Sequence, residues 1–132
     1  MSGTDKRSCI VMDVEMLNAQ GIRWDRMRFM EDFDVTLSLL RRGFPNTVQF
    51  GWCVGQGASN APGGVSDART PESVKLEAET LRHYHPEYVK VMQKQAKNWQ
   101  GMDTRYDVSV SWKKALQHTD LRGVPQTAEQ WW

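Results

Sequence analysis

The sequence predicts a mixed α/β fold, and three observations support this prediction. Residues 47–54 and 105–112 alternate apolar and polar side chains, as half-buried strands do. Residues 32–42 carry their apolar side chains on one helical face. The apolar run at residues 9–12 is typical of a short buried strand. The predicted order is strand, helix, helix, strand, long loop, two helices and strand. Because a usual sheet has roughly five or six strands, we expect this chain to form part of a larger fold.

The N-terminal region is expected to pass from the strand at residues 9–12 into a short helix at residues 13–21. Asp13 is the predicted N-cap of this helix. Gly21 is expected to end it, because glycine adopts the left-handed conformation common after a helix. Residues 22–29 follow as a loop or a short extended piece.

The next segment combines an acidic start, an apolar face and a basic end. We draw its helix from Asp32 or Phe33 to Arg42, and carboxylates at the start with arginines at the end complement the helix dipole. Gly43 supplies a left-handed cap, and Pro45 prevents continuation. The apolar positions recur at the spacing of one helical face: Phe33, Leu37 and Leu40.

A strand and a long loop are predicted next. The strand covers residues 47–54, and the glycine-rich residues 55–70 are expected to form either a lid over an acceptor site or an ordinary surface loop. Thr70 caps a further helix that begins at Pro71. Its apolar face is formed by Val74, Ala78 and Leu81.

The C-terminal region is predicted to contain a second helix of this pair, a strand and a tail. Pro86 restarts a helix over residues 86–99, and residues 105–112 form the last strand. A short helix is expected from about residue 113, followed by a loose tail that ends in two exposed tryptophans.

The composition indicates one soluble globular domain spanning residues 1–132. Hydrophobic residues make up 39% and charged residues 25%, and the net charge of +1 provides no overall attraction for nucleic acid or anionic lipid. No apolar run approaches the roughly 20 residues of a membrane span, and no secretory signal is recognisable. Cys9 and Cys53 are expected to be buried free thiols in a reducing compartment, which favours a cytoplasmic protein.

Residues 10–52 resemble the second half of a GT-A glycosyltransferase of the inverting, family-2 type. The similarity rests on a strand leading into a short helix, on the Gly-x-x-aromatic-acid segment at residues 21–25, and on the pair Glu31-Asp32 that opens a helix ending in Gly43 and an aromatic residue. Downstream, "SNAPGGVSDARTPE" and "HPEYV" are similar to the TET-associated glycosyltransferases of tailed bacteriophages. That family is inferred to attach sugars to hydroxymethylated pyrimidines in phage DNA.

The resemblance implies a partial GT-A-like fold, the acceptor-side half of such an enzyme, and a role for each acidic residue. An inverting transferase needs a carboxylate within hydrogen-bond reach of the acceptor hydroxyl. By similarity, Asp32 is the candidate base and Glu31 orients the acceptor, while Asp34 is a supporting or capping group. Arg41 and Arg42 are candidate phosphate or structural partners, although charges at the C-terminal end of a helix explain them equally well. An acidic helix start is also common in proteins without any catalytic role.

The resemblance also implies a nucleotide-sugar donor and a divalent metal, Mg²⁺ or Mn²⁺. The usual Asp-x-Asp ligands are not found in this chain, and Asp13 with Glu15 reads instead as a helix cap and a dipole partner. His83 or His85 could contribute a metal ligand, but His85 before Pro86 is more simply the end of a helix. We expect a second chain to supply the nucleotide-binding half.

A local basic patch with an aromatic residue is a candidate contact for a DNA acceptor. It consists of Lys90, Lys94, Lys97 and Trp99. Solvated helix charges explain these lysines equally well. The alternative to a transferase component is a non-catalytic binding module, or a decayed or split fragment, derived from the same fold.

Overall fold

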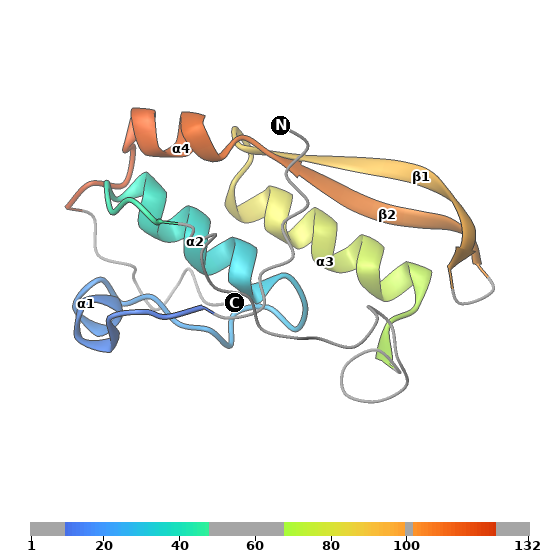
Figure 1. The fold of residues 1–132 in the computed structure, drawn as a ribbon, viewed down its shortest axis with the longest axis horizontal. Coiled ribbons are helices and arrows are strands. Elements are labelled where there is room, and N and C mark those ends of the chain that lie inside the picture. Colours follow the sequence, from blue (N-terminus) through green and yellow to red (C-terminus); the bar gives the residue numbers. More distant parts are fainter. Residues whose placement is uncertain (1–9, 48–67, 100–101, 124–132) are drawn as a thin grey trace.

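The computed structural model describes residues 10–47, 68–99 and 102–123 (Figure 1). The elements run in the order α1, Val14–Ala19; α2, Glu31–Arg41; α3, Pro71–Tyr84; β1, Val89–Trp99; β2, Met102–Val110; and α4, Trp112–His118. The fold is mixed α/β, as the sequence predicts. Among the described residues, no helix is long and apolar enough to cross a membrane.

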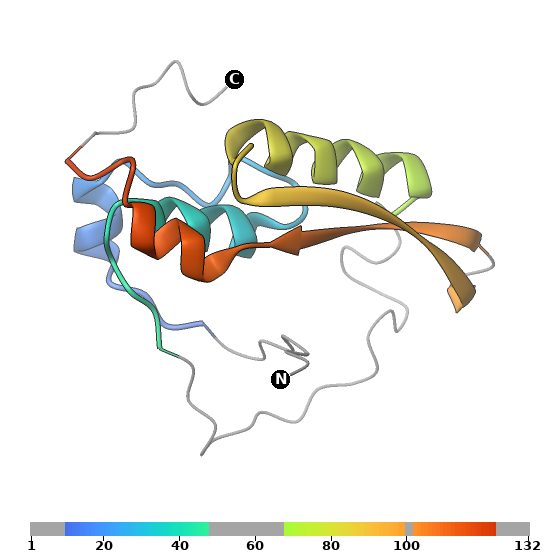
Figure 2. The ribbon, with the colours of Figure 1, turned by 90° about the horizontal axis from the view of Figure 1, so that it is seen from above.

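The hairpin of β1 and β2 is a two-stranded antiparallel sheet with α3 along one of its faces (Figures 1 and 2). Its register pairs Val89 with Val110 and Gln95 with Thr104, and an irregularity follows Gln95. Because cross-strand partners share a face, the residues with odd numbers in β1 lie on the same side as those with even numbers in β2. On this side, Val89 packs in one cluster with Leu81 of α3.

Helix α2 lies at the centre of the described structure, and all of its residues from Asp34 to Leu40 are buried. Leu37 and Leu40 pack toward α3, α4 and the start of β1. Val35 and Leu39 pack on the opposite side against α1 and the loop that follows it. The predicted face of Phe33, Leu37 and Leu40 is therefore confirmed, because Phe33 also borders the first cluster and meets the Trp112 ring edge-on at 5.4 Å.

The predicted helix boundaries are confirmed where local capping chemistry defines them. The Asp13 carboxylate accepts a hydrogen bond from the backbone N–H of Met16 and caps α1. Thr70 and Ser73 form a reciprocal capping box at the start of α3, whose predicted apolar face is buried. Gly21 and Gly43 both have positive φ, 66° and 89°, which end α1 and α2 as predicted.

Two predicted elements are wrong. Of the predicted strand at 9–12, the described residues 10–12 have no regular structure, and Val11 is 92% exposed. The predicted helix at 86–99 is instead the strand β1, because Val89 and Val91 face the opposite side from Lys90 and Lys94 when residues 89–95 pair with 104–110. The strand predicted at 105–112 is confirmed as β2, although Trp112 belongs to α4. Almost all of the strand predicted at 47–54 lies outside the described residues, as do most of the loop 55–70, both cysteines and the C-terminal tail.

Candidate functional site

The three carboxylates at the start of α2 have different environments. Asp34 is 2% exposed and forms a two-pronged ion pair with Arg26, whose Nε lies 2.8 Å from Asp34 Oδ2. Burial alone would raise the pKa of Asp34, but the hydrogen bonds from His85 and Arg26 and the charge of Arg26 outweigh it and hold this pKa below its usual value. Asp34 therefore anchors the first turn of α2 inside the protein.

His85 joins this anchor to the other end of α2. Its Nε2 lies 2.8 Å from Asp34 Oδ1, and its Nδ1 lies 3.0 Å from Nη1 of Arg41. Because a guanidinium only donates hydrogen bonds, Nδ1 must accept, and the proton is on Nε2, which donates to Asp34. Burial lowers the pKa of His85 despite the carboxylate, and the ring is a neutral imidazole.

Arg41 extends these contacts from His85 to the protein surface. Its guanidinium donates to the Tyr84 carbonyl oxygen at 2.9 Å and forms an ion pair with Asp120 at 2.6 Å. The same guanidinium lies 5.1 Å above the Tyr88 ring. Burial and the nearby Asp120 carboxylate raise the pKa of Tyr88 to about 12. A continuous chain of polar contacts thus links Arg26, Asp34, His85, Arg41 and Asp120. We call these five residues the buried network, although its last member, Asp120, is exposed.

Glu31 and Asp32 are half-buried and lie outside the buried network. The Asp32 Oδ1 accepts a hydrogen bond from the N–H of Phe33 at 3.0 Å, so its carboxylate is held at the helix start. Met30, the N-cap, has the left-handed φ of 60°, which is uncommon for a residue other than glycine. The sequence grouped the three acids, whereas the structure separates one buried anchor from two carboxylates that solvent can reach.

The other predicted site residues are spread over the molecule. Arg42 is 3% exposed and donates to the Ser38 carbonyl oxygen at 2.8 Å, which makes it a structural residue of α2. His83 is exposed on α3. Within the described ranges, no group of three or more His, Cys, Asp and Glu side chains is arranged to hold a metal ion. Both ring nitrogens of His85 already have hydrogen-bond partners. His85 therefore has no ring nitrogen left for the divalent metal that the resemblance implies.

The predicted basic patch lies on a strand rather than on a helix. Lys90 and Lys94 are exposed on the face of β1 that is turned away from α3, and Lys97 and Trp99 belong to the same strand. Lys94 pairs with Asp107 of β2 at 2.9 Å. Of the described helices and strands, α3 alone packs on the hairpin, and it covers the opposite face.

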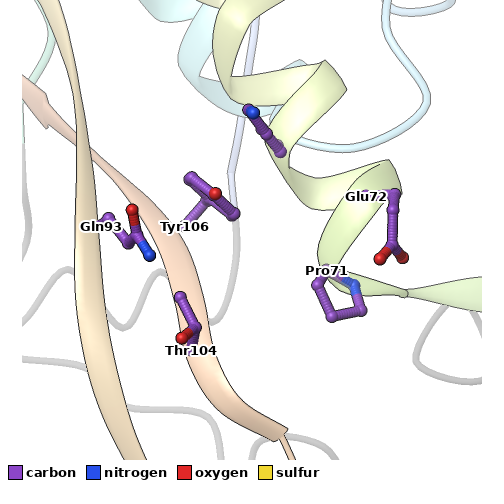
Figure 3. Close-up of a pocket in the computed structure, with 6 residues that line it drawn as sticks. Pro71, Glu72, Gln93, Thr104 and Tyr106 are labelled. Carbon is purple, nitrogen blue, oxygen red and sulfur yellow. The ribbon is translucent and has the colours of Figure 1, made fainter.

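A shallow hollow lies between the start of α3 and the hairpin (Figure 3). It has a volume of about 350 Å³ and is lined by Pro71, Glu72, Lys75, Gln93, Thr104 and Tyr106. The ammonium group of Lys75 lies 5.4 Å from the Tyr106 ring centroid. None of its lining residues comes from α2, so this hollow is separate from Glu31 and Asp32.

Sequence reasoning singled out Asp34, His85 and Arg41 but missed the other two members of the buried network. Arg26 was placed in a loop, and Asp120 in a tail, because neither position has a periodic or capping signal. One signal could have pointed to them. Many charged residues surround a helix that is otherwise apolar, and a carboxylate buried on such a helix needs a charged partner. Comparisons with known proteins add no family: a scan against protein-family models and searches of curated proteins and of solved structures found no match.

The neutral state of buried His85 predicts that the protein loses stability in mild acid. The unfolded chain takes up a proton on this histidine near its ordinary pKa of about 6.5, whereas the folded chain does not. Stability should therefore fall as pH decreases below about 6.5, by at most about 1.4 kcal/mol per pH unit for this group. Urea unfolding between pH 8 and pH 5 measures the slope. His85→Gln, which cannot titrate, should flatten it, whereas the exposed control His83→Gln should not; equal slopes in all three proteins would contradict a neutral His85.

Proposed function

We propose that this chain is the acceptor-side component of an inverting glycosyltransferase with a GT-A-like fold, and that Asp32 is its general base. The observation that carries the proposal is that the three acids at the start of α2 differ in burial and in hydrogen-bond partners. Asp34 is committed to Arg26 and His85, while Asp32 remains half-exposed on a helix turn that the buried network holds in place. A base on a rigid element is what proton abstraction from an acceptor hydroxyl requires.

In this mechanism the acceptor hydroxyl attacks the anomeric carbon of the nucleotide sugar while Asp32 removes its proton. The carbon–oxygen bond to the nucleoside diphosphate breaks as the new glycosidic bond forms, and the proton stays on the carboxylate. Glu31, which directly precedes Asp32, orients the acceptor through a hydrogen bond. In this proposal a second chain provides the donor-binding half and the divalent metal.

The acceptor class that we propose, from the resemblance and from the charge of the hairpin, is DNA carrying hydroxymethylated pyrimidines. The outward face of the hairpin carries Lys90, Lys94 and Arg105, and Asp107 is the one acid among its described side chains, so its charge complements a phosphate backbone. A two-stranded ribbon is also narrow enough to enter the major groove of B-DNA. This support comes from the described face of the hairpin and is independent of the acids on α2.

The DNA part of the proposal predicts a salt-dependent loss of affinity when a lysine of this face is removed. Lys90→Gln should weaken binding to a duplex containing hydroxymethylcytosine and lower the slope of log K against log salt by about 0.9, the value for one lost phosphate contact. Fluorescence anisotropy at several salt concentrations gives both quantities. Lys75→Gln, on α3 over the opposite face, is the matched control. An equal loss in the control, or binding without salt dependence, would exclude the hairpin as the DNA contact.

The transferase part is tested by a transfer assay. The chain is combined with a candidate nucleotide-binding chain, a divalent metal, nucleotide sugars and hydroxymethylated DNA, and release of nucleoside diphosphate is followed. We expect release to require this chain and to be lost in Asp32→Asn. Unchanged release in Asp32→Asn removes Asp32 as the base. Binding of the DNA without any dependence of transfer on this chain would favour the non-catalytic binding module instead.

A further inference from the structure

Two arginines from distant parts of the chain each lie close to one aromatic ring just before α2. The Phe29 side chain is 3% exposed, and the guanidinium carbons of Arg28 and Arg69 lie 5.4 Å and 5.5 Å from its ring centroid. The backbone N–H groups of Arg28 and Phe29 donate to one carboxylate oxygen of Glu77 on α3, at 3.2 Å and 3.1 Å. The ring is thus fixed in the core, and it restrains both guanidinium groups.

These two guanidinium groups differ from most other arginines of the protein. Arg23, Arg26, Arg41, Arg82 and Arg105 each form an ion pair with an aspartate or glutamate. Within the part of the chain that the structure describes, Arg28 and Arg69 have no such partner. Their planar N–H donors therefore remain available for a ligand, and this donor geometry matches the oxygens of a phosphate group.

The position of the pair relates it to the proposed base. Phe29 precedes Asp32 by three residues, so their Cα atoms are at most about 11 Å apart. Three acids lie nearby and oppose anion binding. Glu31 and Asp32 follow Phe29 closely in the chain. Glu77 is in contact with the backbone of Arg28 and Phe29, and one of its two oxygens already accepts a hydrogen bond from each of them. A phosphate must therefore bind at the outer side of the guanidinium groups, where Arg28 is exposed.

We propose that Arg28 and Arg69, held on Phe29, form a phosphate-binding site. The ligand class is a phosphate or diphosphate group. Resting on the proposed function, this site would face the donor held by the second chain and neutralise the charge that develops on the departing nucleoside diphosphate. A phosphate of the DNA backbone has the same chemistry, and the experiment separates these two sources.

The test is equilibrium binding by the full chain, without turnover. Inorganic pyrophosphate, uridine diphosphate and a short DNA duplex are titrated separately, and dissociation constants are measured by calorimetry. We expect Arg28→Gln and Arg69→Gln each to weaken binding by about tenfold or more, the usual loss for one charge-assisted hydrogen bond. Arg28→Lys keeps the positive charge but loses the planar pair of N–H donors. It should therefore bind more tightly than Arg28→Gln and less tightly than the wild type. Circular dichroism verifies that each variant is folded.

Arg82→Gln is the matched control, because Arg82 is an exposed arginine of α3 that is already paired with Glu79. If the Arg28 and Arg69 variants lose affinity only for pyrophosphate and uridine diphosphate, the site binds the leaving group. If they lose affinity only for DNA, the site binds a phosphate of the DNA backbone. Absence of binding by the wild-type chain, or an equal loss in Arg82→Gln, overturns the proposal. Asp32→Asn should not weaken binding, so failure of the base assignment and failure of the phosphate site give different results.

Discussion

Replacing Asp34 with alanine will lower the free energy of unfolding by about 3–5 kcal/mol, the usual cost of breaking a buried ion pair by removing one partner. Arg26 has a side chain that is 5% exposed, and it would keep its charge without the carboxylate that balances it. His85 would also lose the acceptor of its Nε2 proton. Urea unfolding of the purified chain at pH 7.5 measures the change.

The size of this effect is specific to the buried position. Glu79→Gln removes one partner of an exposed ion pair on α3, and we expect it to change the free energy of unfolding by no more than about 0.5 kcal/mol. Because many domains have only about 5–15 kcal/mol of stability, Asp34→Ala could leave too little folded protein for a full transition. Asp34→Asn, which keeps the shape and loses the charge, then provides the measurement. If either Asp34 variant were as stable as Glu79→Gln, Asp34 would not be the anchor of α2.

The second large effect is expected at Asp32 and concerns rate rather than stability. An amide cannot accept the hydroxyl proton, so Asp32→Asn should reduce sugar transfer by about a hundred- to ten-thousand-fold, the usual contribution of general base catalysis. The first turn of α2 loses one favourable charge, which should cost about 1 kcal/mol or less. Initial rates of nucleoside diphosphate release measure the loss. Glu31→Gln is the matched control on the neighbouring residue and should have a smaller effect, because it orients the acceptor without taking its proton.

The helices could be predicted because each one is defined by signals within a few residues. Asp13, Thr70 with Pro71, and Gly43 determine where α1, α3 and α2 begin or end, and these positions act through local backbone hydrogen bonds and φ preferences. The strand β1 could not be predicted in the same way. Lys90 and Lys94 suit a helix surface and a strand surface equally well, and the deciding factor is the pairing of Val89 and Val91 with Val110 and Val108.

Only part of the candidate site could be predicted from the sequence, for a similar reason. The acids on α2 were visible in the sequence, but their separation into a buried anchor and half-exposed groups depends on contacts between distant segments. Asp34 meets His85 across 51 positions, and Arg41 meets Asp120 across 79. The approach of Arg28 and Arg69 to Phe29 has the same origin. Such contacts follow from how α2 and α3 pack, which no local pattern encodes.

The central claim is that two acids two positions apart on α2 have different roles: Asp34 holds the helix and Asp32 takes a proton. Measuring unfolding free energy and transfer rate side by side for Asp32→Asn and Asp34→Asn tests it most directly. We predict that Asp32→Asn remains as stable as the wild type to within about 1 kcal/mol and loses nearly all transfer, while Asp34→Asn is strongly destabilised. Wild-type transfer rates in a folded Asp32→Asn protein would contradict the claim.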